Sequence, residues 1–185
     1  MNRLYAIVIA IGLGVSLATA GVLSAGSGGD DKRDGKREFK AKLQGFQEVP
    51  AISTTGKGTF TAVLSADKTT LSYTLTYSGL IGDVHQAHIH LGQKGVNGGV
   101  SVFLCETANA QDPFAEGAPG DAPTCPQEGT VTGVLTNVNI IGPNAQGIAP
   151  GEFGELVVAL ESGVTYANVH SMRWPGGEIR GQISD

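Results

Sequence analysis

Residues 70–77 read Thr-Leu-Ser-Tyr-Thr-Leu-Thr-Tyr, a strict alternation of small polar and large apolar side chains. Successive side chains of a β-strand point to opposite faces of its sheet, so this period of two puts the four large residues on one face. Leucine next to tyrosine and threonine is also a composition typical of strands. The turn Ala66-Asp67-Lys68 joins this stretch to a second alternating stretch at residues 59–64, and together they predict a β-hairpin with one buried face.

Outward from this hairpin, the rest of the chain beyond residue 39 shows the same short alternating segments separated by turn residues such as Gly142-Pro143-Asn144 and Pro175-Gly176-Gly177. One stretch differs, because residues 152–161 carry apolar side chains at helical spacing and are followed by Ser162-Gly163, which predicts a short crossover helix. The sequence therefore predicts an all-β antiparallel sandwich or barrel with one helix. The expected strands are residues 39–46, 59–64, 70–77, 84–91, 100–105, 130–138, 165–172 and 178–184.

The N-terminus has the features of an export signal. Met1-Asn2-Arg3 is a short positive start, residues 4–23 are apolar, and Ala18-Thr19-Ala20 has the small-x-small form of a cleavage site. We expect a signal peptide over residues 1–20, a flexible charged linker over 21–38 and a β domain over 39–185. An uncleaved membrane anchor is the alternative, since about 20 apolar residues can span a bilayer. Either places the domain outside the cytoplasm, secreted, periplasmic or at the cell surface.

Charge and cysteine content restrict the function further. The 185 residues carry a net charge of −5 without a basic stripe, which argues against nucleic acid as a partner. The two cysteines, Cys105 and Cys125, flank a segment rich in Ala, Asp, Pro, Glu and Gly. In an oxidising compartment we expect them to form a disulfide, with two free thiolate metal ligands as the alternative.

The histidines are the main candidates for a functional site. In Ala87-His88-Ile89-His90 the two imidazoles share one face of a predicted strand and the apolar residues share the other. Neighbouring rings on one strand face can bind a single ion, and imidazole ligands suit copper or zinc better than calcium. His170, in another predicted strand, is the natural third ligand, and His85 is a fourth candidate that needs a bend because its parity is opposite. The alternative is that these histidines are ordinary polar residues of a half-solvated strand face.

Four ordered segments resemble the CHRD domain, a family named for the extracellular protein chordin with many stand-alone bacterial members. They are Leu43-Gln44-Gly45-Phe46-Gln47-Glu48-Val49-Pro50, Ala87-His88-Ile89-His90, Tyr166-Ala167-Asn168-Val169-His170-Ser171 and Pro175-Gly176-Gly177-Glu178-Ile179-Arg180-Gly181-Gln182, spread over residues 39–184. The resemblance implies an immunoglobulin-like fold that is distantly similar to copper-zinc superoxide dismutase. In that dismutase a strand with a His-x-His motif helps to bind copper on the outer face of the barrel. Four histidines are too few for both metal sites of that dismutase.

Three functions follow as expectations. The first is an exported binding domain that holds one copper or zinc ion through His88, His90, His170 and His85, with an extracellular protein or a small ligand as its partner. The second is a copper-only oxidoreductase related to the dismutase. The third is a metal-free interaction or adhesion module. A membrane is a partner only if the N-terminal segment stays uncleaved. Arg173 and Arg180 are expected to pair with Glu178 on the surface, with the guiding of an anion as the alternative.

Overall fold

The computed structural model describes residues 36–107 and 122–185, which form a single sheet of eight antiparallel strands with one α-helix and three short 3₁₀ helices. The strands are β1 (Arg37–Gln44), β2 (Lys57–Leu64), β3 (Leu71–Ser78), β4 (Val84–Leu91), β5 (Gly99–Glu106), β6 (Gly129–Leu135), β7 (Thr165–Ser171) and β8 (Trp174–Gln182). The helices are η1 (Gly45–Gln47), η2 (Asn137–Asn139), η3 (Asn144–Gln146) and α1 (Phe153–Glu161). The predicted all-β class is confirmed.

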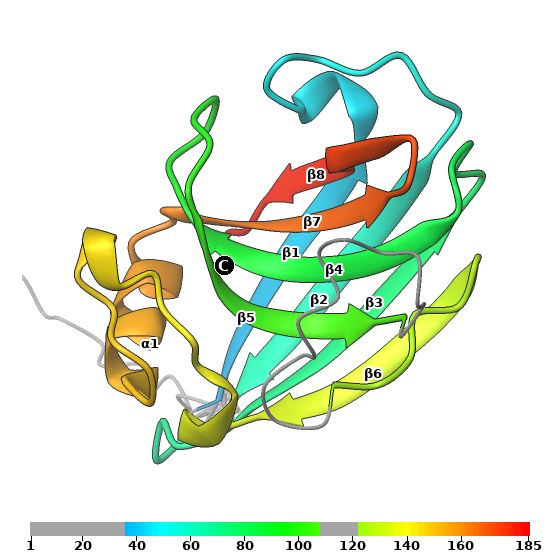
Figure 1. The fold of residues 1–185 in the computed structure, drawn as a ribbon. Coiled ribbons are helices and arrows are strands. Elements are labelled where there is room, and N and C mark those ends of the chain that lie inside the picture. The colour runs from blue at the N-terminus through cyan, green and yellow to red at the C-terminus, as the bar shows by residue number, and fades with distance from the viewer. Residues whose placement is uncertain (1–35, 108–121) are drawn as a thin grey trace, which may run out of the picture. The chain divides into compact units, whose positions relative to one another are not determined.

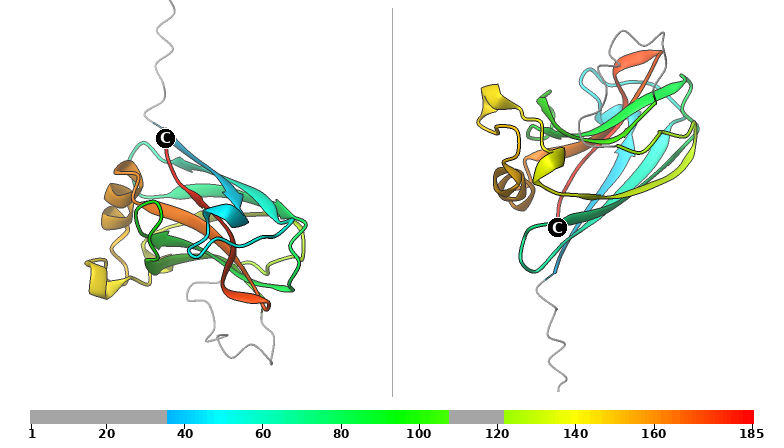
Figure 2. Two further views of the ribbon diagram at one scale, coloured as in Figure 1. Left: turned by 90° about the horizontal axis from the view of Figure 1, so that it is seen from above. Right: turned by 60° about the horizontal axis from the view of Figure 1, so that its bottom comes forward.

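The sheet curls on itself into a nearly closed barrel. Its strand order is β5-β4-β7-β8-β1-β2-β3-β6, and β4, β5 and β7 lie in front of β1, β2 and β3 in Figure 1. The two halves meet at β1 and β8, which share the Gln44–Arg180 pair, and an isolated bridge joins Lys40 of β1 to Ser184 just beyond the end of β8. Viewed from two further directions, the same strands enclose the common interior (Figure 2). Every expected strand is therefore present and antiparallel to its neighbours.

Alternation along the strands builds the core. On β3 the side chains of Leu71, Tyr73, Leu75 and Tyr77 are buried, and the residues between them face solvent except for the part-buried Ser78 at the strand end. Burial of a large apolar side chain contributes roughly 1.5–3 kcal/mol, so a one-residue slip that exposed this set is strongly disfavoured. β1, β2 and β6 show the same pattern toward the interior. By contrast, β4 and β7 are buried on both faces, which has consequences for the histidines.

The helix α1 lies at one end of the barrel (Figure 1). Phe153, Leu156, Val157 and Leu160 recur at helical spacing and are all buried, as their pattern in the sequence predicts. The helix ends before Gly163, which has φ +68°, a backbone conformation that glycine adopts without the steric cost of a Cβ. The predicted helix is confirmed, beginning one residue later than expected.

Strand ends differ from the expectation at β8. Pro175-Gly176-Gly177 was expected to form a turn, but these residues lie within β8, and the turn between β7 and β8 is formed by Met172 and Arg173. The register between the two strands shifts between Val169 and Ser171, and Gly177 has φ +124°. A local irregularity of this kind lets proline and glycine sit inside a strand, where they are otherwise disfavoured.

Two long-range links outside the strand ladders fasten the loops. Cys105 and Cys125 form a disulfide with a Cα–Cα distance of 5.0 Å, as predicted. The buried carboxylate of Glu178 accepts hydrogen bonds from the hydroxyls of Thr54 and Ser171, both at 2.6 Å, and from the backbone N–H groups of Ile81 and Gly82 at 2.7 and 3.3 Å. Glu178 thus joins three separate segments rather than pairing with an arginine on the surface.

The expected signal peptide (1–20) and most of the expected linker (21–38) lie outside the described residues. Strand β1 begins at Arg37. Among the residues that the structure does describe, none belongs to a helix with the length and apolar character needed to cross a membrane.

Candidate metal centre

The two histidines of β4 lie on the face opposite the core, as their parity predicts. Ala87 and Ile89 are fully buried in the hydrophobic core, whereas His88 and His90 point the other way. That other face is not half-solvated, because His88 and His90 are only 3% and 6% exposed. The ring of Phe103 packs edge-on against His88 at 4.3 Å, and Tyr166 stacks on His90 at 4.7 Å with the two planes within 1°. The alternative, that these histidines lie on a half-solvated strand face, is therefore wrong for His88 and His90.

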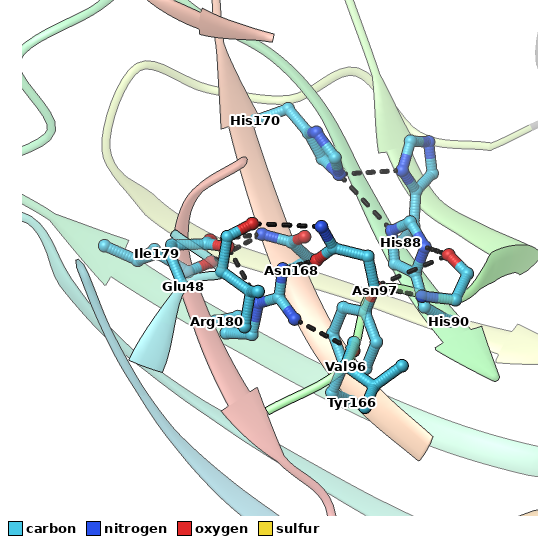
Figure 3. Close-up of polar contacts among 12 residues, drawn as sticks. Glu48, His88, His90, Val96, Asn97, Tyr166, Asn168, His170, Ile179 and Arg180 are labelled. Carbon is cyan, nitrogen blue, oxygen red and sulfur yellow. Dashed lines mark hydrogen bonds and ion pairs between the residues drawn. The ribbon is translucent and has the colours of Figure 1, made fainter. Parts of the chain in front are cut away.

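His170 joins this pair from the neighbouring strand. β7 runs antiparallel to β4, with Gln86 opposite His170, so His170 lies next to the two histidines on the same face. The Nδ1 atom of His88 is 3.1 Å from the Nε2 atom of His170, and the Nε2 atom of His90 is 3.4 Å from the same atom (Figure 3). One ligand nitrogen from each of the three rings lies within 4.8 Å of the other two.

These distances fit a shared metal ion. Copper and zinc bind imidazole nitrogen at about 2.0–2.1 Å, so two ligands of a tetrahedral ion lie about 3.3 Å apart. The separations of 3.1 and 3.4 Å match that spacing for two of the three pairs of rings, and the ligand atoms of the group all lie within 4.8 Å of one another. The ligand set would be His88 Nδ1, His90 Nε2 and His170 Nε2, one nitrogen from each of three neutral rings.

Backbone carbonyls determine which nitrogens carry the protons. His90 Nδ1 is 3.0 Å from the carbonyl oxygen of Gly98, and His170 Nδ1 is 2.8 Å from that of Pro175. A carbonyl oxygen only accepts hydrogen bonds, so in both neutral rings Nδ1 carries the proton and Nε2 carries a lone pair. The 3.4 Å contact between the Nε2 atoms of His90 and His170 therefore joins two acceptors, and neither atom carries a proton to donate to the other.

Burial keeps these rings neutral. Desolvation lowers the pKa of His90 to about 4 and that of His170 to about 3, and the positive charge of Arg180 acts on both in the same direction. Desolvation also lowers the pKa of His88 well below its usual range. At neutral pH all three rings are uncharged and carry a single proton each, and the neutral ring is the form in which imidazole binds a metal.

His85 does not belong to the three-ring cluster. Its ring centroid is 6.2 Å from that of His170, in an edge-to-face arrangement, and no ligand atom of His85 joins the group formed by the other three rings in the described part of the chain. The parity of His85 is opposite to that of His88 and His90, and the strand pairing shifts register between Val84 and Gln86. This shift is the bend that brings His85, itself buried, near the cluster.

Sequence reasoning missed the polar residues around the cluster. Arg180 donates from Nε to Oε2 of Glu48 at 2.7 Å, and its guanidinium lies 4.3 Å from the centroid of the Tyr166 ring. Asn168, which lies opposite His88 on β7, donates to Oε1 of Glu48 at 2.7 Å. Arg180 thus pairs with Glu48, 132 residues away, and not with Glu178 as expected. Only the ordered motifs that contain Glu48, Asn168 and Arg180 signal this network in the sequence.

Both cysteine sulfurs are used by the disulfide, which leaves no thiolate from this pair for a metal. The histidine nitrogens are thus the candidate ligands among the residues that the structure describes.

A model of the CHRD domain matches residues 39–183, which is most of the chain. The chain belongs to the CHRD domain family. Neither curated proteins nor solved structures give a significant match, so the distant likeness to the dismutase stays a prediction.

The match includes every residue of the candidate centre. Glu48, the two histidines of β4, His170 and Arg180 all fall within the matched range. The cluster is thus part of the CHRD domain itself and not of the segments before or after it.

Proposed function

We propose that this CHRD domain binds one transition-metal ion, copper or zinc, through His88 Nδ1, His90 Nε2 and His170 Nε2. The contact between the Nε2 atoms of His90 and His170 carries the proposal. Both atoms hold lone pairs because their partner nitrogens donate to carbonyls, and they are 3.4 Å apart in a buried site. Two neutral acceptors at this distance repel each other, and a cation between them turns the repulsion into two bonds.

The donor set favours copper or zinc over calcium or magnesium. Imidazole nitrogen suits both metals, whereas calcium and magnesium require oxygen ligands. The carbonyls of Gly98 and Pro175 orient two of the rings, an arrangement that usually accompanies histidine ligands in metal proteins. Because His170 Nε2 can only accept, His88 Nδ1 is the donor of their shared contact, and a metal held through His88 Nδ1 would require that proton to move to Nε2.

We further propose that the domain works outside the cytoplasm. The disulfide fits an oxidising compartment, and the apolar N-terminal segment of residues 4–23 supports export. A metal ion bound there would come from the extracellular or periplasmic fluid.

A titration of the purified chain with Zn²⁺ or Cu²⁺ against a competing chelator tests this proposal. We expect one ion per chain, and a loss of at least a hundredfold in affinity in His90→Ala and in His170→Ala because each removes one of three ligands. His85→Asn is the matched histidine control, and we expect it to retain one ion with little change in affinity. Absence of stoichiometric binding, or wild-type affinity in either His90→Ala or His170→Ala, would contradict the proposal.

A further inference from the structure

A buried ion pair lies beside the histidine cluster and on the same side of the sheet (Figure 3). The side chains of Arg180 and Glu48 are only 5% and 2% exposed. Glu48 also accepts from Asn168, so both of its oxygens are engaged. Burying two charges is costly even when they pair, and hydrophobic residues of similar volume often replace such a pair without loss of stability. The groups that the Glu48–Arg180 pair contacts point to a role other than stability.

The guanidinium of Arg180 holds the connection between β4 and β5. Its Nη1 donates to the carbonyl oxygen of Val96 at 3.3 Å, and its Nη2 donates to Oδ1 of Asn97. Asn97 in turn donates from Nδ2 to the carbonyl oxygen of Val49 at 2.9 Å, which ties this loop to the segment that follows Glu48. The next residue, Gly98, supplies the carbonyl that accepts the Nδ1 proton of His90.

Arg180 also contacts the aromatic ring against which His90 lies. The guanidinium packs on Tyr166, and the Tyr166 ring is parallel to the imidazole of His90. The hydroxyl of Tyr166 accepts from the backbone N–H of Gly98 at 3.1 Å. The plane of the His90 ring and the acceptor for its Nδ1 proton are thus both set by groups that Arg180 touches.

We propose that the Glu48–Arg180 pair is a positioning device for His90. Glu48 fixes the guanidinium, the guanidinium fixes residues 96–98 and the Tyr166 ring, and these hold His90 with its proton on Nδ1. The Nε2 lone pair then faces His170 before any metal arrives. The effect of the pair on metal affinity rests on the proposed function, whereas its effect on the proton of His90 does not.

The test compares Asn97→Ala with Gln93→Ala. Both residues are exposed amides of the same loop, so neither substitution threatens folding, and only Asn97 bonds to Arg180. Arg180→Lys is a stronger variant, because lysine keeps the charge and loses the fork that reaches two loop groups at once. The first measurement is the nitrogen chemical shifts of the His90 ring in metal-free protein at neutral pH, which report its tautomer. The second is the Zn²⁺ dissociation constant.

In the wild type and in Gln93→Ala we expect His90 to be protonated on Nδ1 alone. In Asn97→Ala and Arg180→Lys we expect a mixture of the two tautomers and a Zn²⁺ dissociation constant about tenfold to a hundredfold higher, the usual effect of losing an outer-shell partner. A loss of stability alone would leave the tautomer unchanged. A His90 tautomer that is identical in all four proteins overturns the positioning role. If Zn²⁺ fails to bind the wild type while the tautomer still shifts, the metal proposal fails and the positioning role stands.

Discussion

Acid should destabilise the metal-free domain through its buried histidines. In the unfolded chain, imidazoles take up protons below pH about 6.5. In the folded chain, burial lowers the pKa of His90 to about 4 and that of His170 to about 3. The stability that these rings contribute is therefore complete above pH 6.5 and is lost as the pH falls toward the folded values, because only the unfolded state gains protons in that window.

The size of the effect follows from the two pKa values. Each ring that is protonated in the unfolded state alone removes about 1.4 kcal/mol of unfolding free energy per pH unit. Between pH 6.5 and pH 5, His90 and His170 each remove about 2 kcal/mol, and His88 adds to this because burial also lowers its pKa. Loss of about 4 kcal/mol or more is a large fraction of the 5–15 kcal/mol that typically stabilises a domain.

Urea unfolding at a series of pH values, with a chelator present and the disulfide intact, measures this directly. In His90→Gln the slope of unfolding free energy against pH between pH 6 and pH 5 should fall by about 1.4 kcal/mol per pH unit, because one titrating ring is gone. Gln93→Ala, an exposed loop change, should keep the wild-type slope. A wild-type stability that is constant between pH 6.5 and pH 5, or an unchanged slope in the histidine variant, would refute the reasoning.

Three further predictions concern the fold and the metal. Glu178→Gln should lower the unfolding free energy by about 2 kcal/mol, because the amide nitrogen of glutamine would face N–H and O–H groups that now donate to a carboxylate oxygen. An unchanged urea midpoint would contradict this. Replacing Cys105 and Cys125 together by alanine should lower the unfolding free energy by about 3 kcal/mol in the same assay, because the disulfide closes a loop of 20 residues. A decrease of less than about 1 kcal/mol would argue against this stabilisation. Zinc at a hundredfold excess over its dissociation constant should stabilise the wild type by about 2.7 kcal/mol in thermal unfolding at neutral pH. The same zinc concentration should not stabilise His170→Ala. An equal shift in both proteins would count against a site at His170.

Local patterns predicted the elements of this fold well. The alternation at residues 70–77 and the helical spacing of Phe153, Leu156, Val157 and Leu160 are properties of the neighbouring sequence alone, and each element formed within one residue of the expected bounds. The start of β8 at Trp174 was not predictable in this way. It depends on a register shift against β7 that the pairing of two whole strands decides, while proline and glycine locally indicate a turn.

The candidate site was likewise predictable only where it depends on neighbouring residues of one strand. Parity along β4 placed His88 and His90 on one face, and that placement is confirmed. The cover over that face comes from residues outside β4, among them Tyr166 on a distant strand and Gly98 in the loop after β4, so the burial of the histidines could not be read from β4 itself. The Glu48–Arg180 pair is similarly a product of the folded chain, because a charged residue shows its sign in the sequence but not its partner.

If three imidazoles hold one ion, anomalous diffraction will locate that ion among them. Crystals grown with Zn²⁺ or Cu²⁺ and measured on either side of the metal's absorption edge would locate the ion. We expect one anomalous peak at about 2.0–2.1 Å from each of His88 Nδ1, His90 Nε2 and His170 Nε2. A peak at other residues, or no peak at this cluster in the presence of excess metal, would contradict it.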